Sequence, residues 1–401
     1  MEKGKITSGR KKTKPIRRSA AMGPKAPARK RVPKKNTTRK VVRKSILNAA
    51  RLGTQRKVSK NLRLKRSEEN PVITPHPDRP WESQQTFNSA AFLVDGKVHL
   101  LYRALGGGGI SVIGYAVSED GLSVDERSDV PVYVSLPNVN AGARSRKRSA
   151  PFLYSSGGGF GGCEDPRAVL IDGCVYMLLT VFNGWDSVRA VLTSIGLDEL
   201  LAKKWDWKEP IRISPPGEIH KNWVIFPEKI HGKYAILHSI SPEILIEYVE
   251  SLDLFDGKRY IRSNFRKIMR KNVWDSWVRG AGPPPLKTLD GWLLLYHAMD
   301  QRDPDRYKLG AMILDVDDPT KVIARSTAPI LEPDEWYENN GNKASVIYSC
   351  GAVIKDGKLF VYYGGADTVV CVATADLKKF LAALLQGRPA RLTRRRTQNR
   401  K

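Results

Sequence analysis

The segment GGCEDPRAVLIDG places two acids between a glycine-rich stretch and an apolar run. Glu164 and Asp165 are followed directly by Pro166 and Arg167. A carboxylate in such a place is a surface charge, half of an ion pair, or a proton donor in general acid catalysis. The last role needs other polar groups at the same point, so the elements around Asp165 decide between the three.

The chain repeats one short pattern five times, in the segments FLVDGKVHLLYRA, AVLIDGCVYMLLTVF, EKIHGKYAILHSI, PLKTLDGWLLLYHAM and AVIKDGKLFVYYGGA. Each segment has an apolar strand, an Asp-Gly or His-Gly turn and a second apolar strand. Asp-Gly between apolar runs indicates a β-hairpin, because the turn requires positive φ. The turn glycines are Gly96, Gly173, Gly232, Gly291 and Gly357, and a further strand-like segment follows each hairpin.

These repeats predict an all-β chain of five small antiparallel sheets. Radial packing of repeated sheets gives a β-propeller, so a five-bladed β-propeller is our first prediction and a β-sandwich is the second. Long loops usually carry function, and the longest, Pro131–Phe160, leads directly to Asp165. Residues Phe380–Leu385 are expected to form a short terminal helix.

The positive charge of the chain, +27 overall, is concentrated at its ends. Residues 1–66 hold 25 Lys and Arg and one acid, residues 387–401 hold seven Lys and Arg and no acid, and the rest is close to neutral at −4. We therefore expect a basic, largely disordered N-terminal extension (1–66), a catalytic propeller (67–386) and a basic C-terminal tail (387–401). The tails are either solvated extensions or arms that contact polyanions through counterion release.

Several classes of protein are disfavoured by the sequence. Its four cysteines show no metal-ligand spacing and suit a reducing cytosol, so we predict a cytoplasmic protein without a metal site. No apolar run approaches the length of a membrane span, and no secretory signal is recognised. Nucleotide-binding fingerprints and serine-hydrolase motifs are missing as well. The oligomeric state stays open, with a homo-oligomer among the alternatives.

Polar residues recur where the repeated strands end, and in a propeller such ends converge on one mouth. They are Asn88, Arg103, Asp165, Arg167, Asn222, His297, Asp300 and Asp367. Acids and amides of this kind hydrogen-bond sugar hydroxyls, and nearby Trp and Tyr can take the C–H face of a sugar ring. The pattern therefore favours a carbohydrate site.

Seven segments, in order, resemble glycoside hydrolase family 130, the β-mannoside phosphorylases and related mannosidases. They are FNSAAF, LLYRA, GCEDPRAV, KNWVIFPEKIHGKY, GAGPPPLKT, LLLYHAMD and CGAVI…YYGGADT, and the match runs from about Asn70 to Leu385. The resemblance implies a five-bladed propeller and an inverting glycoside phosphorylase acting on β-linked manno-oligosaccharides. Orthophosphate would be the co-substrate, no cofactor would be needed, and α-mannose 1-phosphate would be released.

The resemblance also implies roles for single residues. Asp165 matches the general acid, which must be protonated near neutral pH in a closed, sugar-filled pocket. Asn88, Arg103, Asp300 and Asp367 are expected to bind sugar, and Lys221, Asn222, His297 and Tyr307 to bind phosphate or the adjacent sugar. Glu164 is taken as structural. Arg167 is either a sugar contact or the partner of a neighbouring acid, and the structural role is favoured.

This chain departs from the family at two expected cations. Ser239 stands where phosphorylases usually have Arg, and Val278 where they usually have Lys. Losing one Arg costs on the order of 1.5–3 kcal/mol of charge-assisted bonding to phosphate. Arg279 or the loop AGARSRKRS compensates, or the site uses water and the protein is a β-mannosidase. An inactive carbohydrate- or nucleic-acid-binding propeller is the alternative from another class.

Overall fold

The five turns predicted from the sequence each join two antiparallel strands in the computed structural model, which describes residues 62–135, 161–182, 188–263 and 269–387. The hairpins are β2 (Gln85–Val94) with β3 (Lys97–Leu105), β6 (Gly161–Ile171) with β7 (Cys174–Phe182), β10 (Val224–Ile225) with β11 (Tyr234–Ser239), β14 (Leu286–Thr288) with β15 (Gly291–Asp300), and β18 (Ile347–Lys355) with β19 (Lys358–Gly365).

Four of these turns use the backbone conformation that the Asp-Gly pattern predicts. In the first hairpin both Asp95 and Gly96 have positive φ, 49° and 75°, as a type I′ turn requires. The same holds for the turns at Gly173, Gly232 and Gly357, whereas at Gly291 the preceding residue is not left-handed. The all-β class is therefore confirmed.

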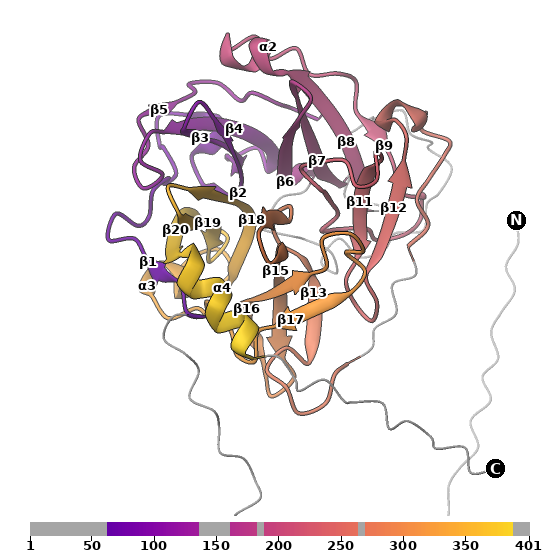
Figure 1. Ribbon diagram of the computed structural model, residues 1–401. Coiled ribbons are helices and arrows are strands. Elements are labelled where there is room, and N and C mark those ends of the chain that lie inside the picture. The colour runs from indigo at the N-terminus through magenta and orange to yellow at the C-terminus, as the bar shows by residue number, and fades with distance from the viewer. Residues whose placement is uncertain (1–61, 136–160, 183–187, 264–268, 388–401) are drawn as a thin grey trace, which may run out of the picture. The chain divides into compact units, whose positions relative to one another are not determined.

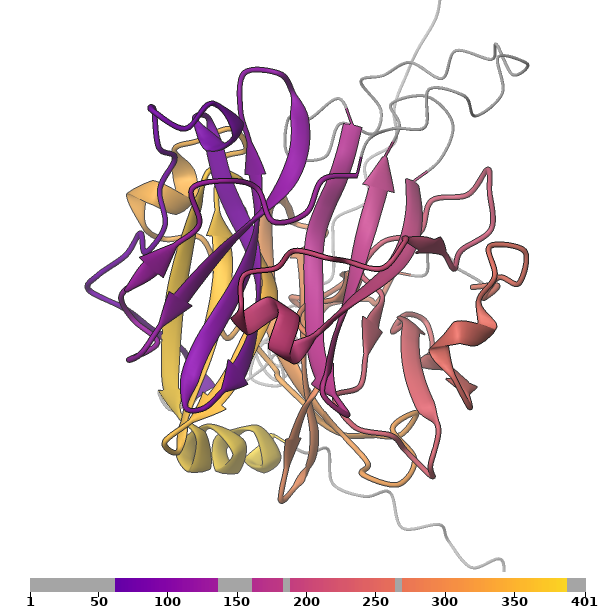
Figure 2. The ribbon, with the colours of Figure 1, turned by 90° about the horizontal axis from the view of Figure 1, so that it is seen from above.

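Each hairpin gains further strands, and together they form four sheets (Figure 1). The first two hairpins share one eight-stranded sheet, because β4 (Ile110–Ser118) pairs in parallel with β6 at two positions. Its other strands are β5 (Glu126–Arg127), β8 (Val188–Gly196) and β9 (Ile211–Arg212). Figure 2 shows these two hairpin sets side by side. Five separate sheets were expected, and this parallel junction is the difference.

The other three hairpins lie in sheets of their own. β12 (Leu245–Val249) extends the third hairpin, and β13 (Trp277–Ala281), β16 (Asp303–Leu314) and β17 (Val322–Arg325) extend the fourth. The last sheet has the order β1-β20-β19-β18, with β1 (Lys65–Arg66) and β20 (Val369–Asp376). The short helices are α2 (Leu197–Leu201), α3 (Trp336–Asn339), η2 (Pro80–Glu82) and η4 (Leu252–Leu254).

Apolar side chains fill the spaces between consecutive hairpin sets, and the first set packs against the last as well. Along β3, Val98, Leu100 and Tyr102 contact one neighbouring set while Leu101 contacts the other. Successive residues of a strand point to opposite faces, so a strand buried on both faces appears as a continuous apolar run. The five clusters are represented by the pairs Leu101–Met177, Leu178–Ile236, Leu237–Leu294, Leu295–Val361 and Leu100–Phe360.

Both ends of the described chain close the last sheet. Leu62 and Leu64 are buried, and β1 pairs with β20, so residues 62–66, which the sequence grouped with the N-terminal extension, belong to the folded unit. The expected terminal helix is confirmed as α4 (Leu377–Gln386), beginning where Asp376 accepts a hydrogen bond from the Lys379 N–H at 2.9 Å. Phe380 and Leu384 of α4 are buried in the same cluster.

Two expectations from the sequence remain, one about the basic segments and one about membrane spans. The basic stretches 1–61 and 388–401 and the loop AGARSRKRS lie outside the described residues. Among the described residues, no helix is long and apolar enough to cross a membrane.

Candidate active site

A cavity of about 330 Å³ opens where several hairpin sets bring their inner strands together. Six of the expected site residues line it: Asn88, Asp165, Lys221, Asn222, Tyr307 and Asp367. The other lining residues include His238, Ser239, Val278, Arg279, Lys343 and Tyr348. Of the eight strand-end residues expected to converge, Asn88, Asp165, Asn222 and Asp367 line the cavity, and Arg103, Arg167, His297 and Asp300 do not.

Irregular backbone presents the polar side chains to this cavity. The pairing of β2 with β3 shifts register between Phe87 and Ala90, and that of β6 with β7 shifts between Glu164 and Arg167. Asn88 and Asp165 lie within these two bulges at φ values of 51° and 52°, and Asn222 has a φ of 64°. A bulge re-aims a side chain that would otherwise follow the strand alternation, and left-handed non-glycine residues are costly. The backbone is thus shaped around these three residues.

Asp165 lies in a buried network of opposite charges. Its Oδ1 accepts hydrogen bonds from Asn88 Nδ2 at 2.9 Å and from Arg103 Nη1 at 3.3 Å. Arg103 also donates to Glu164 Oε1 at 3.2 Å, and Lys221 Nζ donates to the second Glu164 oxygen at 3.2 Å. Arg103 and Glu164 are fully buried. Glu164 therefore joins two cations, which fits the structural role expected for it.

The surroundings make Asp165 more acidic. Burial alone would raise the pKa of Asp165, but the charges of Arg103, Lys221 and Arg167 and the hydrogen bond from Asn88 outweigh it and lower this pKa below its ordinary value. Asp367 behaves in the opposite way. Burial and the charge of Asp165 raise the pKa of Asp367 to about 6, although Lys343 acts against them. Of the two carboxyls, Asp165 is therefore the more acidic and Asp367 the more basic.

The two expected arginines lie beneath the cavity surface and are not among the residues that line it. Arg167 donates to the carbonyl oxygens of Gly282 at 2.8 Å and Asp165 at 2.9 Å and to Asn222 Oδ1 at 3.0 Å. It thereby fixes the backbone of Asp165 and the side chain of Asn222. This placement supports the structural role favoured for Arg167, and it gives Arg103 a supporting position behind Asp165.

The residues expected to bind phosphate are divided between the cavity wall and the layer behind it. Asn222 Nδ2 donates to the Arg279 carbonyl at 3.1 Å, and the Tyr307 hydroxyl lies 3.4 Å from Arg279 Nε. His297 is fully buried, stacked at 4.1 Å on Tyr348, and is not among the lining residues. Burial, with the charge of Arg167, lowers its pKa to about 3.

His297 is consequently a neutral ring with a defined tautomer. Its Nε2 accepts a hydrogen bond from the Ser349 N–H at 2.9 Å, so the proton resides on Nδ1. Among the described residues this Nδ1 has no hydrogen-bond partner.

Asp300 is not brought to the cavity, so its placement corrects the expected sugar contact. The pairing of β15 with β16 shifts register between Ala298 and Asp300. The Asp300 carboxylate instead binds Arg302, whose Nη2 lies 2.6 Å from Oδ2. Strand-end position alone was therefore an insufficient criterion.

The positions that depart from the family do face the cavity. Ser239 and Val278 both line it, together with Asn222. Arg279 lines it too, with its guanidinium 4.4 Å from the centre of the Trp277 ring. Arg279 thus occupies the place in which a compensating cation was expected.

Lys343 and Tyr348 are among the lining residues that sequence reasoning missed. The Tyr348 hydroxyl donates to Asn222 Oδ1, and Arg167 Nη2 donates to the Tyr348 hydroxyl at 3.2 Å. Lys343 lies in the loop before the fifth hairpin, and Tyr348 is the second residue of its first strand, β18. Within the described ranges, no cluster of His, Cys, Asp and Glu suited to a metal ion is found.

Comparison with known proteins shows which family this chain is similar to. A family model for glycoside hydrolase family 130, described as beta-1,4-mannooligosaccharide phosphorylase, matches residues 63–385. A 1,2-beta-oligomannan phosphorylase of Thermoanaerobacter sp. is 39% identical over 328 residues, which are 79% of this chain and 98% of the relative. A beta-1,2-mannobiose phosphorylase of the same strain is 36% identical, with the same coverage.

A solved structure is similar as well. The beta-1,2-mannobiose phosphorylase of Listeria innocua, in complex with beta-1,2-mannobiose, superposes with a TM-score of 0.60 and 25% identity, covering 80% of this chain and 99% of that one. The residues that the family model matches, 63–385, include the cavity lining and every hairpin set. This chain therefore belongs to glycoside hydrolase family 130.

Proposed function

We propose that the protein is an inverting phosphorylase of β-linked manno-oligosaccharides that releases α-mannose 1-phosphate. One observation carries the proposal: a buried carboxylate, Asp165, shares a cavity with three cations, Lys221, Arg279 and Lys343. A phosphorylase needs a proton donor for the leaving sugar and positive charge for phosphate in the same space. We further propose β-1,2 linkages, supported by the activities named for the two Thermoanaerobacter relatives.

In the proposed reaction Asp165 gives its proton, through a hydroxyl of the mannosyl ring, to the glycosidic oxygen. The bond between that oxygen and C1 breaks while a phosphate oxygen forms a bond to C1 from the opposite face. Because the neighbouring cations lower the pKa of Asp165, its acid form requires bound substrates that oppose them. Sugar excludes water and phosphate adds negative charge, and both raise the pKa of a carboxyl.

The five hairpin sets are proposed to be the blades of a propeller. The support is the arrangement of apolar clusters, each shared by two consecutive sets, with the first and last sets sharing one as well. Radial packing produces this arrangement, whereas the two facing sheets of a sandwich share a single interface.

The decisive experiment incubates the protein with β-1,2- and β-1,4-mannobiose, with and without phosphate, and identifies the products by NMR. We expect α-mannose 1-phosphate from the β-1,2 substrate only when phosphate is present. Free mannose formed at equal rates with and without phosphate would identify a β-mannosidase, which the uncharged Ser239 and Val278 favour. No reaction with either sugar, together with retained sugar binding, would identify an inactive lectin-like protein.

The variant Ser239→Arg tests the anion site directly. Because Ser239 lines the cavity near Asn222, a guanidinium there can meet two phosphate oxygens at once. We expect the KM for phosphate to fall about tenfold, as one added charge-assisted contact allows. An unchanged or higher KM in a normally folded variant would contradict the proposed position of the phosphate.

A further inference from the structure

The three cations of the cavity differ in how far their charge is already neutralised. Lys221 is bound to Glu164 at 3.2 Å, and Arg279 lies over the Trp277 ring. Lys343 lines the cavity without an ion pair among the described residues, and its ammonium is 6.0 Å from the centre of the Tyr307 ring. The charge of Lys343 opposes the rise of the Asp367 pKa, but Lys343 forms no direct ion pair within the described residues that would hold its ammonium away from an incoming anion.

We propose that Lys343 is a binding residue for the phosphate co-substrate and replaces the charge missing at Ser239 and Val278. This inference rests on the proposed phosphorolysis and deepens it. The Lys343 side chain reaches the cavity wall that Tyr307 also lines, and Tyr307 is joined through its hydroxyl to Arg279 at 3.4 Å. Two unpaired cations thus flank one tyrosine, an arrangement suited to a small dianion.

The loop that carries Lys343 is held at several backbone points. The Lys343 N–H donates to the Ala366 carbonyl at 2.9 Å, next to Asp367, and the Asn342 N–H donates to Thr368 Oγ1 at 2.9 Å. The Tyr307 N–H donates to the Ser345 carbonyl at 2.9 Å. The backbone of Lys343 is therefore held in place relative to both Tyr307 and Asp367, although the Lys343 side chain is exposed.

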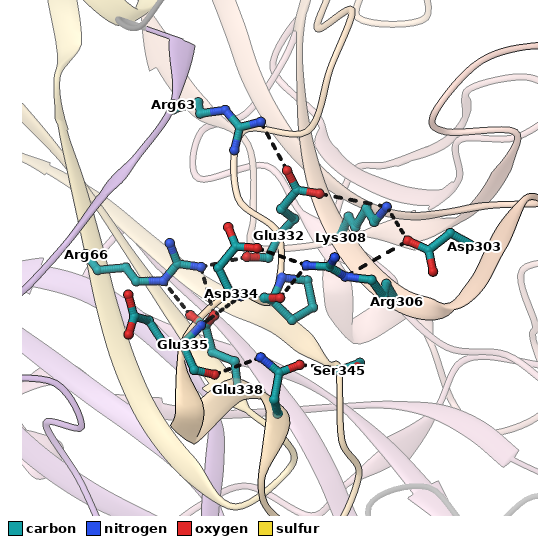
Figure 3. Close-up of polar contacts among 12 residues, drawn as sticks. Arg63, Arg66, Asp303, Arg306, Lys308, Glu332, Asp334, Glu335, Glu338 and Ser345 are labelled. Carbon is teal, nitrogen blue, oxygen red and sulfur yellow. Dashed lines mark hydrogen bonds and ion pairs between the residues drawn. The ribbon is translucent and has the colours of Figure 1, made fainter.

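A half-buried ion pair lies in the helix that precedes this loop (Figure 3). Arg66 of β1 donates to both oxygens of Glu338 in α3, at 2.7 and 2.8 Å. The same carboxylate accepts the Asp334 and Glu335 N–H groups at 2.7 and 2.9 Å and the Tyr363 hydroxyl at 2.8 Å. Glu338 is fully buried and caps the first turn of α3, so this pair fixes the start of the short helix that leads into the loop of Lys343.

The first experiment compares Lys343→Met, Lys343→Arg and the control Lys358→Met in the full chain. Lys358 is an exposed lysine at the start of β19, and it does not line the cavity. Initial rates at varied inorganic phosphate, and calorimetric titration with inorganic phosphate, are measured for each. For Lys343→Met we expect the KM for phosphate to rise about 10- to 100-fold, the value for one charge-assisted contact, with the KM for sugar unchanged. Lys343→Arg should recover most of the loss.

The result that would overturn the proposal is equal phosphate KM and equal phosphate affinity for Lys343→Met and Lys358→Met. This failure is distinct from failure of the proposed function. If the unmodified protein makes α-mannose 1-phosphate while Lys343→Met behaves like the control, phosphorolysis stands and Lys343 is excluded. If the unmodified protein releases mannose without phosphate, the proposed function itself fails.

A double-mutant cycle tests the support of the loop. Glu338→Gln should raise the KM for phosphate when Lys343 is present and leave it unchanged in the Lys343→Met background, because the effect passes through Lys343. Melting temperatures are recorded in parallel. Equal effects in both backgrounds, or an effect on melting alone, would overturn the positioning role of the Arg66–Glu338 pair.

Discussion

Under the proposed mechanism, Asp165 must be held in a fixed position and must also be able to carry a proton. It must be fixed by neighbours, which here are Asn88 and Arg103, yet the same positive neighbours lower its pKa. Bound sugar and phosphate would raise the pKa of Asp165 again, because sugar excludes water and phosphate adds negative charge. Under the proposed mechanism, the protonation of Asp165 then depends on whether sugar and phosphate are bound, and proton donation requires both.

Asp165→Asn should abolish most of the activity and leave the fold intact. The amide keeps the shape of the side chain and cannot act as an acid, so kcat should fall by about 10²–10⁴. Sugar binding by calorimetry and the melting temperature should stay near those of the parent. Parental activity would exclude Asp165 from the chemistry, and loss of activity together with melting would assign it a structural role only.

Asp367 should make stability depend on pH in a defined direction. Its folded pKa of about 6 lies above the ordinary 3.8, so the folded protein holds this proton more tightly than the unfolded chain. Its contribution is present below about pH 4 and is lost as pH rises toward 6. Asp367→Asn should remove that decline.

Thermal unfolding of Asp367→Asn at pH 4, 5, 6 and 7 checks this, with the exposed Asp305→Asn as the control. The variant should gain stability relative to the parent as pH rises across this range. A parallel pH profile for variant and parent would show that the Asp367 carboxyl titrates normally.

At the scale of elements, close backbone contacts hold the bulges in place. A Cβ on Gly364 of β19 would lie 2.1 Å from Asn88 Oδ1 and 3.0 Å from the Asn88 backbone nitrogen. Only glycine permits this approach, which fixes the amide that donates to Asp165.

Gly364→Ala should therefore displace Asn88 and lower kcat at least about tenfold, with a loss of about 1–3 kcal/mol in the free energy of unfolding from overpacking. Gly108→Ala is the matched control, since a Cβ at Gly108 would meet nothing within 4 Å. Activity and denaturant unfolding are measured for both variants. Equal activity in the two would show that the Asn88–Asp165 contact tolerates movement.

The sequence predicts elements that depend on local interactions better than it predicts contacts between residues far apart in the chain. Hairpins at Asp95-Gly96 and its equivalents depend on local turn chemistry, so their positions were accurate. The parallel junction of β4 with β6 depends on residues Ile110 and Gly161, which are far apart in the chain and carry no local signal. Lys343 was missed for the same reason, because its position depends on distant partners such as Ala366.

At the scale of the whole molecule, the basic extension and the folded unit should have separable properties. Deleting residues 1–57 should leave the turnover of short mannosides unchanged and remove any salt-dependent affinity for polyanions. Turnover and binding to a polyanion at two salt concentrations are the measurements. Strong polyanion binding by the shortened protein would assign that property to the nearly neutral folded unit.

Extending the deletion to residue 66 should have a different effect. It removes the buried Leu62 and Leu64 and the Arg66–Glu338 pair. Loss of a buried leucine side chain typically costs about 2–5 kcal/mol, so the melting temperature should fall clearly below that of the 1–57 deletion. Equal melting of the two shortened proteins would show that residues 58–66 add nothing to stability.

The pairing of Lys65 with Thr374 also has a consequence for biosynthesis. During translation at about 5–20 residues per second, roughly 15–60 s pass between the appearance of these two residues. Throughout that time the last sheet lacks its partner strands, and Leu62 and Leu64 have no completed core to enter. The strand edges of the last sheet therefore stay unpaired until β20 has been synthesised and has left the ribosome.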